Sequence, residues 1–83
     1  MERPELETWV RTELAYVLDL PVDEVQAGSD LAEDLDADSF DLIELINRVE
    51  RTYKVKIDEH EFHELETVGE MVDLVERAMA RAR

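Results

Sequence analysis

Apolar side chains recur at helical spacing along most of this 83-residue chain. The pattern is clearest in residues 39–53, where five large apolar side chains fall within about 60° of one direction on a helix that turns about 100° per residue. These five are Leu42, Leu45, Ile46, Val49 and Tyr53. With 45% apolar residues and only two Gly and two Pro, the chain favours a compact helical fold over a disordered or all-β one.

Three further segments are expected to be helical. The first begins at Pro4, a residue well suited to a first helical turn. The last opens on Thr67-Val68-Gly69-Glu70, a sequence typical of a capping box. Between them lies a short segment with Phe62 and Leu65 as inward anchors. We therefore predict one domain over residues 1–83 with an all-α, four-helix bundle fold. Its expected elements are helices at about 4–20, 39–53, 58–65 and 67–82, and a long loop at 21–38.

The charge of the chain is strongly negative and unevenly distributed. The formal net charge is −14, which argues against nucleic acid as a partner because phosphate binding needs Lys and Arg. No Lys or Arg occurs between Arg11 and Arg48, whereas eleven Asp or Glu fall in that interval. Such a run is either a solvated acidic surface or a segment that steers basic partners toward the protein. We expect partners with basic docking surfaces.

The sequence shows no signal for export or for a membrane span. Its first residues lack a basic start followed by an apolar region, and no stretch approaches the roughly 18 apolar residues that a spanning helix needs. The absence of cysteine removes disulfides and thiolate metal sites. We expect a cytoplasmic monomer.

Ser39 is the candidate for chemistry, because it stands where the long acidic loop meets the helix at 39–53. Either Asp38 or Ser39 caps that helix, or the exposed hydroxyl is modified by another enzyme. Ser39 is a poor nucleophile of its own, since it lacks the glycines of a nucleophile elbow and the histidines are on another helix. We therefore expect no catalytic residue in this chain.

The sequence gives little support for a metal-binding site. Asp34, Asp36 and Asp38 match the first, third and fifth positions of a calcium-binding EF-hand loop, but Leu45 stands where a bidentate Glu is required. His60 and His63 are three residues apart on a short helix and have no further ligand at a metal-site spacing. We expect no specific metal site.

Two large apolar side chains, Phe40 and Ile43, lie away from the expected buried stripe, on the side that also carries Glu44 and Asn47. Two explanations are open. Either the long loop folds over these side chains, or they form a contact surface for partners or a wall of a ligand cavity.

Around Ser39 the sequence resembles the acyl carrier protein family, and the resemblance extends over nearly the whole chain. The family motif Leu-Gly-Ala-Asp-Ser-Leu, followed by an acidic helix, is similar to residues 35–41. The motif residues here are Leu35-Asp36-Ala37-Asp38-Ser39-Phe40-Asp41. Further segments that resemble the family are residues 31–34, 43–45, 49–50, 53–57 and 67–73.

The resemblance implies a covalent cofactor on Ser39. A separate phosphopantetheinyl transferase, using Mg²⁺, would transfer 4′-phosphopantetheine from coenzyme A to this serine. The thiol of the arm would then hold acyl groups as thioesters for acyl-processing enzymes of fatty acid, polyketide or related metabolism. The residues implied in partner binding are Asp38, Phe40, Asp41, Ile43, Glu44 and Asn47. The residues implied in lining an acyl cavity are Leu45 and Ile46.

The sequence also departs from the family pattern. Asp36 replaces the usual Gly, Phe40 replaces the usual Leu, and Arg48 and Arg51 bring positive charge to a helix that is often acidic. The departures at Asp36 and Phe40 motivate an alternative function, an acidic adaptor that keeps the fold without phosphopantetheine. A peptidyl carrier is a further alternative, although Asp38 before the serine resembles acyl carriers more than peptidyl carriers.

Overall fold

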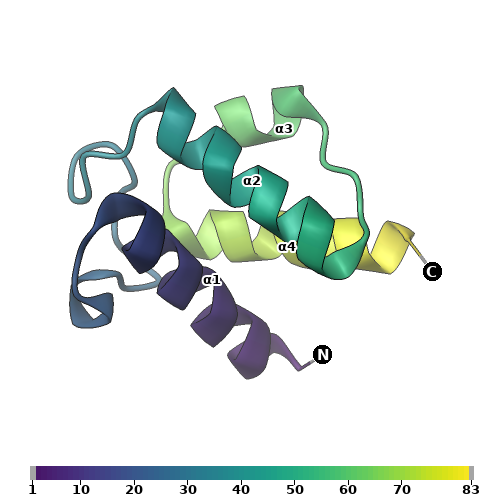
Figure 1. Ribbon diagram of the computed structural model, residues 1–83, viewed down its shortest axis with the longest axis horizontal. Coiled ribbons are helices and arrows are strands. Elements are labelled where there is room, and N and C mark those ends of the chain that lie inside the picture. Colours follow the sequence, from purple (N-terminus) through teal and green to yellow (C-terminus); the bar gives the residue numbers. More distant parts are fainter. Residues whose placement is uncertain (1, 83) are drawn as a thin grey trace.

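The computed structural model describes residues 2–82 of the chain. Its elements are α1 (Arg3–Leu18), the 3₁₀ helix η1 (Val22–Glu24), α2 (Ser39–Tyr53), α3 (Glu59–His63) and α4 (Val68–Arg81). Helix α1 packs against α2 and α4, and α3 packs against α4 (Figure 1). The described residues contain four α-helices and no β-strand, so the predicted all-α fold is confirmed.

Three of the four α-helices have bounds that differ from the expected ones. Helix α1 ends at Leu18, before Pro21, because Asp19 adopts a left-handed conformation with φ of 57° and its N–H caps the last turn. Helix α3 has five residues, shorter than the segment 58–65, and Asp58 caps it by accepting a hydrogen bond from the His60 N–H. Helix α4 begins one residue after Thr67 and ends at Arg81. Helix α2 has the expected bounds.

The buried stripe expected on α2 is confirmed. Leu45, Ile46 and Val49 are buried, and Leu42 and Tyr53 pack against the core with part of their surface exposed. The Tyr53 ring meets the Trp9 ring of α1 edge-on, with centroids 5.0 Å apart. One stripe on α2 therefore joins this helix to the common core.

The long loop at 21–38 is anchored at several points. Its apolar residues Val25, Leu31 and Leu35 are buried in the core. The sequence predicted no helix in this loop, but the loop contains the short helix η1. The Leu31 N–H donates to the Glu66 carbonyl at 2.8 Å, next to an isolated bridge between residues 30 and 67. This anchoring fixes the path of the chain toward α2.

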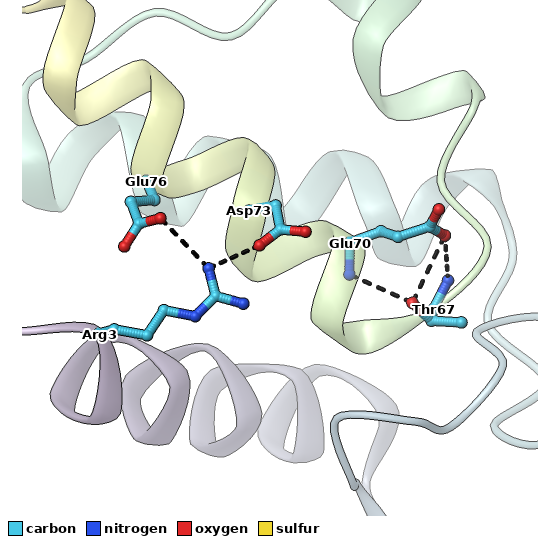
Figure 2. Close-up of polar contacts among 5 residues, drawn as sticks. All are labelled: Arg3, Thr67, Glu70, Asp73 and Glu76. Atoms are coloured by element: carbon cyan, nitrogen blue, oxygen red, sulfur yellow. Dashed lines mark hydrogen bonds and ion pairs between the residues drawn. The ribbon is translucent and has the colours of Figure 1, made fainter.

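The start of α4 closes on the same loop. The N–H groups of Val68 and Gly69 donate to the carbonyls of Ser29 and Ala27, at 3.1 and 2.8 Å. A Cβ atom at Gly69 would lie only 3.1 Å from the Ala27 oxygen, so the close approach suits glycine. The predicted capping box is also present at the start of α4. Thr67 Oγ1 accepts a hydrogen bond from the Glu70 N–H, and Glu70 Oε1 accepts one from the Thr67 N–H (Figure 2).

Helices α1 and α4 are also joined at the surface. Arg3 Nη1 lies 2.6 Å from Asp73 Oδ1 and 3.4 Å from Glu76 Oε1, as Figure 2 shows. The hydrogen bond to Asp73 raises the pKa of the Arg3 guanidinium. Because all three side chains are partly exposed, this contact contributes little to stability. Ala82, which the expected range of the last helix included, lies beyond the end of α4 and is exposed.

Candidate functional site

The first turn of α2 is closed by Asp38 and Asp41. Asp38 Oδ1 accepts a hydrogen bond from the Asp41 N–H at 3.0 Å, and Asp41 Oδ2 accepts one from the Asp38 N–H at 3.1 Å. Asp38 is therefore the N-cap of α2, and Ser39 is its first helical residue. Of the two candidates for the cap, the structure selects Asp38.

This arrangement leaves Ser39 exposed and its hydroxyl uncommitted. Within residues 2–82, no hydrogen bond engages the Ser39 hydroxyl or the backbone N–H groups of Ser39 and Phe40. Free N–H groups and the helix dipole favour an anionic group at such a helix start. The position therefore fits a phosphodiester on the Ser39 oxygen, with the first two N–H groups of the helix beside it.

The chain turns at Asp36, three residues before Ser39. Asp36 has φ of 54°, in the left-handed region that glycine enters most easily. Aspartate is among the few other residues that tolerate this conformation. The next residue is tied back to the loop, because the Ala37 N–H donates to the Leu31 carbonyl at 2.8 Å. Asp36 thus adopts the backbone conformation that glycine would supply.

Phe40 and Ile43 form an exposed apolar pair beside Ser39. Phe40 is 81% exposed and Ile43 is 38% exposed, and Asn47 follows them on α2 as an exposed polar residue. The long loop does not cover them, so the suggestion that it folds over these side chains is wrong. The loop residues that turn inward are buried in the core instead.

The acidic side chains near Ser39 differ in how freely they can meet a partner. Asp38 is exposed, whereas Asp41 and Glu44 are half-buried. Glu44 Oε1 accepts a hydrogen bond from Arg48 Nε at 3.1 Å, and the same guanidinium reaches Glu13 of α1 at 3.1 Å. Glu44 is therefore already paired within the molecule.

The two ion pairs of Arg48 are contacts that sequence reasoning missed. The guanidinium carbon of Arg48 also lies 4.7 Å from the centre of the Tyr16 ring. The hydrogen bond to Glu13 is the main cause that raises the pKa of Arg48. The spacing of Glu44 and Arg48, four residues apart on one helix, is a signal that could have revealed the nearer pair.

The residues implied in an acyl cavity are packed in the core. Leu45 is 0% exposed and Ile46 is 5% exposed. Neither lines the cavity of about 240 Å³ that opens beside the start of α2. The apolar lining of that cavity comes from Leu31, Ala32, Ala37, Leu42 and Leu65. Its rim carries Asp30, Glu33 and Glu66.

The candidates for metal binding, the two histidines and the acidic loop residues, have other roles in the structure. His63 stacks on the Phe62 ring, with centroids 4.7 Å apart. Asp34 Oδ2 accepts a hydrogen bond from the Asp30 N–H at 2.7 Å and so serves the fold of the loop. Residues 2–82 contain no group of three or more His, Cys, Asp or Glu placed to hold a metal ion. Nor does any helix in the described part of the chain have the length and apolar character to cross a membrane.

Comparison with known proteins gives a consistent result. A family model described as a phosphopantetheine attachment site matches residues 8–75. The acyl carrier protein of Borreliella burgdorferi strain ZS7 is 38% identical over 77 residues, which cover 93% of this chain and 96% of the relative. That of Saccharopolyspora erythraea is 32% identical over 81 residues, covering 98% and 85%. The solved structure of the acyl carrier protein from Enterococcus faecalis matches with a TM-score of 0.74 and 27% identity, over 94% of this chain and 99% of that one.

Proposed function

Since this chain belongs to the acyl carrier protein family, we propose that Ser39 is the residue that carries its 4′-phosphopantetheine arm. The observation that carries the proposal is the capping box of α2. Because Asp38 and Asp41 satisfy each other, the Ser39 hydroxyl stays exposed and free to react. The chain has one other serine, Ser29, whose Oγ accepts a hydrogen bond from the Gln26 N–H at 3.0 Å.

The modification needs a separate enzyme. The Ser39 oxygen forms a new bond to the phosphorus of coenzyme A that bears the pantetheine, and the bond from that phosphorus to the nucleotide half breaks. The hydroxyl proton passes to the phosphopantetheinyl transferase, with Mg²⁺ balancing phosphate charge. When bound, the arm supplies a thiol that holds acyl groups as thioesters. The residues of this chain hold and present the arm, so the protein acts as a carrier and not as a catalyst.

Partner enzymes dock, in this proposal, on the exposed surface around Ser39. Phe40 and Ile43 supply its apolar part, and Asn47 extends it along α2. Asp38 and Asp41 supply negative charge for partners with basic surfaces. Glu44 takes part only when a partner cation competes with Arg48 for its carboxylate.

Short apolar acyl groups fit the cavity beside Ser39 better than the core. Leu42 and Leu65 give this cavity an apolar wall, and its volume of about 240 Å³ suits a short chain. Leu45 and Ile46 would have to move before an acyl chain reached them, since both are buried. The proposed carrier is a monomer that works in the cytoplasm, in fatty acid, polyketide or related acyl metabolism.

One of the two reasons for the adaptor alternative is weakened. An adaptor without the cofactor was suggested by Asp36 in place of glycine and by Phe40 in place of leucine, and Asp36 has φ of 54°, in the left-handed region that glycine would supply. No observation on the described residues favours an unmodified protein over a modified one.

Intact mass spectrometry tests the proposal. The purified protein is incubated with coenzyme A, Mg²⁺ and a broad-specificity phosphopantetheinyl transferase, beside the variants Ser39→Ala and Ser29→Ala. We expect a single phosphopantetheine addition in the wild type and in Ser29→Ala, and none in Ser39→Ala. Addition to Ser39→Ala, or no addition to folded wild type with several transferases, would overturn the assignment.

A further inference from the structure

Three cationic side chains gather at the end of α2 without ion-pair partners. Arg51, Lys54 and Lys56 are exposed, and none of them lies within salt-bridge distance of a carboxylate in residues 2–82. The chain has 23 Asp and Glu and a net charge of −14, so three unpaired cations close together stand out from their surroundings. By contrast, Arg3 and Arg48 are each paired with two carboxylates. The end of α2 is therefore a local positive region on an acidic protein.

These cations line an open groove of about 480 Å³. Lys54 ends α2 in a left-handed conformation with φ of 56°, so the chain turns there before Val55 and Lys56. The remaining lining residues are Asn47 and Glu50. The Glu50 carboxylate is already committed to the fold, since its Oε2 accepts a hydrogen bond from the Ile57 N–H at 2.9 Å. The groove offers three cations and one amide to an anionic ligand.

The groove lies on the same side of α2 as Ser39. At about 100° per residue, the groove residues Asn47, Glu50 and Lys54 lie within about 80° of Ser39 around the helix, and Arg51 lies about 120° from it. Ser39 and Arg51 are twelve residues apart, or about 18 Å along the axis. A phosphopantetheine arm has about fifteen chain atoms from the serine oxygen to the sulfur. Five residues of extended backbone have the same number of chain atoms and span about 17 Å, so the fully extended arm has about this length. At full extension the arm therefore passes Asn47, about 12 Å along the axis from Ser39, and an acyl group on its thiol adds the remaining reach to Arg51.

The cavity beside Ser39 has the opposite electrostatic character. Its rim carries Asp30, Glu33 and Glu66, so it repels a negatively charged acyl end. We propose that the groove lined by Arg51, Lys54 and Lys56 binds the free carboxylate of a dicarboxylic acyl group held on the arm. This proposal rests on Ser39 being the attachment site. Apolar acyl groups then use the cavity, and acyl groups ending in a carboxylate use the groove.

The test attaches a probe without any transferase. Because the chain has no cysteine, Ser39→Cys provides a single thiol that can be alkylated with a tether of the same length as the arm. One tether ends in a carboxylate and a matched tether ends in a carboxamide. Backbone amide chemical shifts of both conjugates are compared at neutral pH and low salt. A failed modification of Ser39 by transferases would overturn the function but would leave this measurement intact.

We expect the carboxylate tether, and not the carboxamide, to shift the amide signals of residues 51–56. The difference should fall several-fold between about 20 and 500 mM salt, since exposed charge pairs are screened. It should vanish in Arg51→Gln/Lys54→Asn/Lys56→Gln, where Asn suits the left-handed position. Arg77→Gln, a neutralised cation outside the groove, should keep it. Equal shifts from both tethers, or carboxylate-specific shifts centred on Leu42 and Leu65, would overturn the proposal.

Discussion

Asp38 and Asp41 hold the first turn of α2 by exchanging two hydrogen bonds, each carboxylate accepting from the backbone N–H of the other residue at 3.0 and 3.1 Å. Ser39 lies between them and takes no part in the exchange. The same two carboxylates supply the negative charge nearest to the proposed attachment site. Their structural role and their charge can therefore be separated by substitution.

Asp38→Asn keeps an N-cap acceptor and removes one charge, whereas Asp38→Ala removes both. We expect Asp38→Ala to lose about 1 kcal/mol of unfolding free energy, and Asp38→Asn to lose a few tenths. Both should slow association with a basic partner at low salt, because both lose the charge. Urea denaturation and stopped-flow association measure the two effects. Slower association in Asp38→Ala alone would show that the cap, and not the charge, matters for docking.

Asp36 should tolerate glycine and reject a β-branched residue. With φ of 54°, Asp36→Val is expected to lose about 1 to 2 kcal/mol of unfolding free energy, since the left-handed region is costly for such side chains. Asp36→Gly should stay within about 0.5 kcal/mol of wild type, because relief of strain is offset by a more flexible unfolded chain. Equal stability of the Val and Gly variants by urea denaturation would contradict the left-handed assignment.

Arg48 is expected to limit the availability of Glu44 to partners. Arg48→Gln frees Glu44 and Glu13, so association with a basic partner should become roughly two- to threefold faster at low salt and depend more steeply on salt. The same variant should be less stable than wild type, because it loses both ion pairs and the contact with Tyr16. Stopped-flow association over a range of salt concentrations provides the measurement.

The control for this prediction is Arg77→Gln. It changes the net charge by the same amount but removes a cation of α4 that has no ion pair in the described part of the chain. If Arg77→Gln accelerated association as much as Arg48→Gln, overall charge would explain the effect and the pairing of Glu44 would not.

The parts of this structure that follow from local rules were predictable from the sequence. The apolar stripe of α2 and the capping box of Thr67 and Glu70 depend on residues a few positions apart. The end of α1 was misplaced, because the left-handed turn at Asp19 precedes the more obvious signal at Pro21. The ion pair of Arg48 and Glu13 joins residues 35 positions apart, and only the packing of α1 on α2 brings them together.

Leu45 and Leu42 should respond differently to truncation. Leu45 is fully buried, so Leu45→Ala is expected to lose about 2 to 5 kcal/mol of unfolding free energy. Leu42 is half-buried and lines the cavity beside Ser39, so Leu42→Ala should lose about 1 to 2 kcal/mol. Only Leu42→Ala should alter the amide shifts that a short apolar acyl group induces on the carrier. A larger shift change in a folded Leu45→Ala protein would place the acyl group in the core.

Tyr53 should make the stability of the protein fall in alkaline solution. Burial is the main cause that raises the pKa of its phenol, and the charge of Glu13 adds to the effect. Above the ordinary tyrosine pKa of about 10, the unfolded chain loses this proton while the folded chain still holds it. Stability from Tyr53 is therefore complete below about pH 10 and is lost as the pH rises through the folded pKa. Urea denaturation at pH 8 to about 11 should show a shallower decline for Tyr53→Phe than for wild type. Tyr16→Phe is the matched control, because it changes an exposed tyrosine and keeps a ring beside Arg48. If the decline of stability with pH became equally shallow in Tyr16→Phe, the effect would not come from Tyr53.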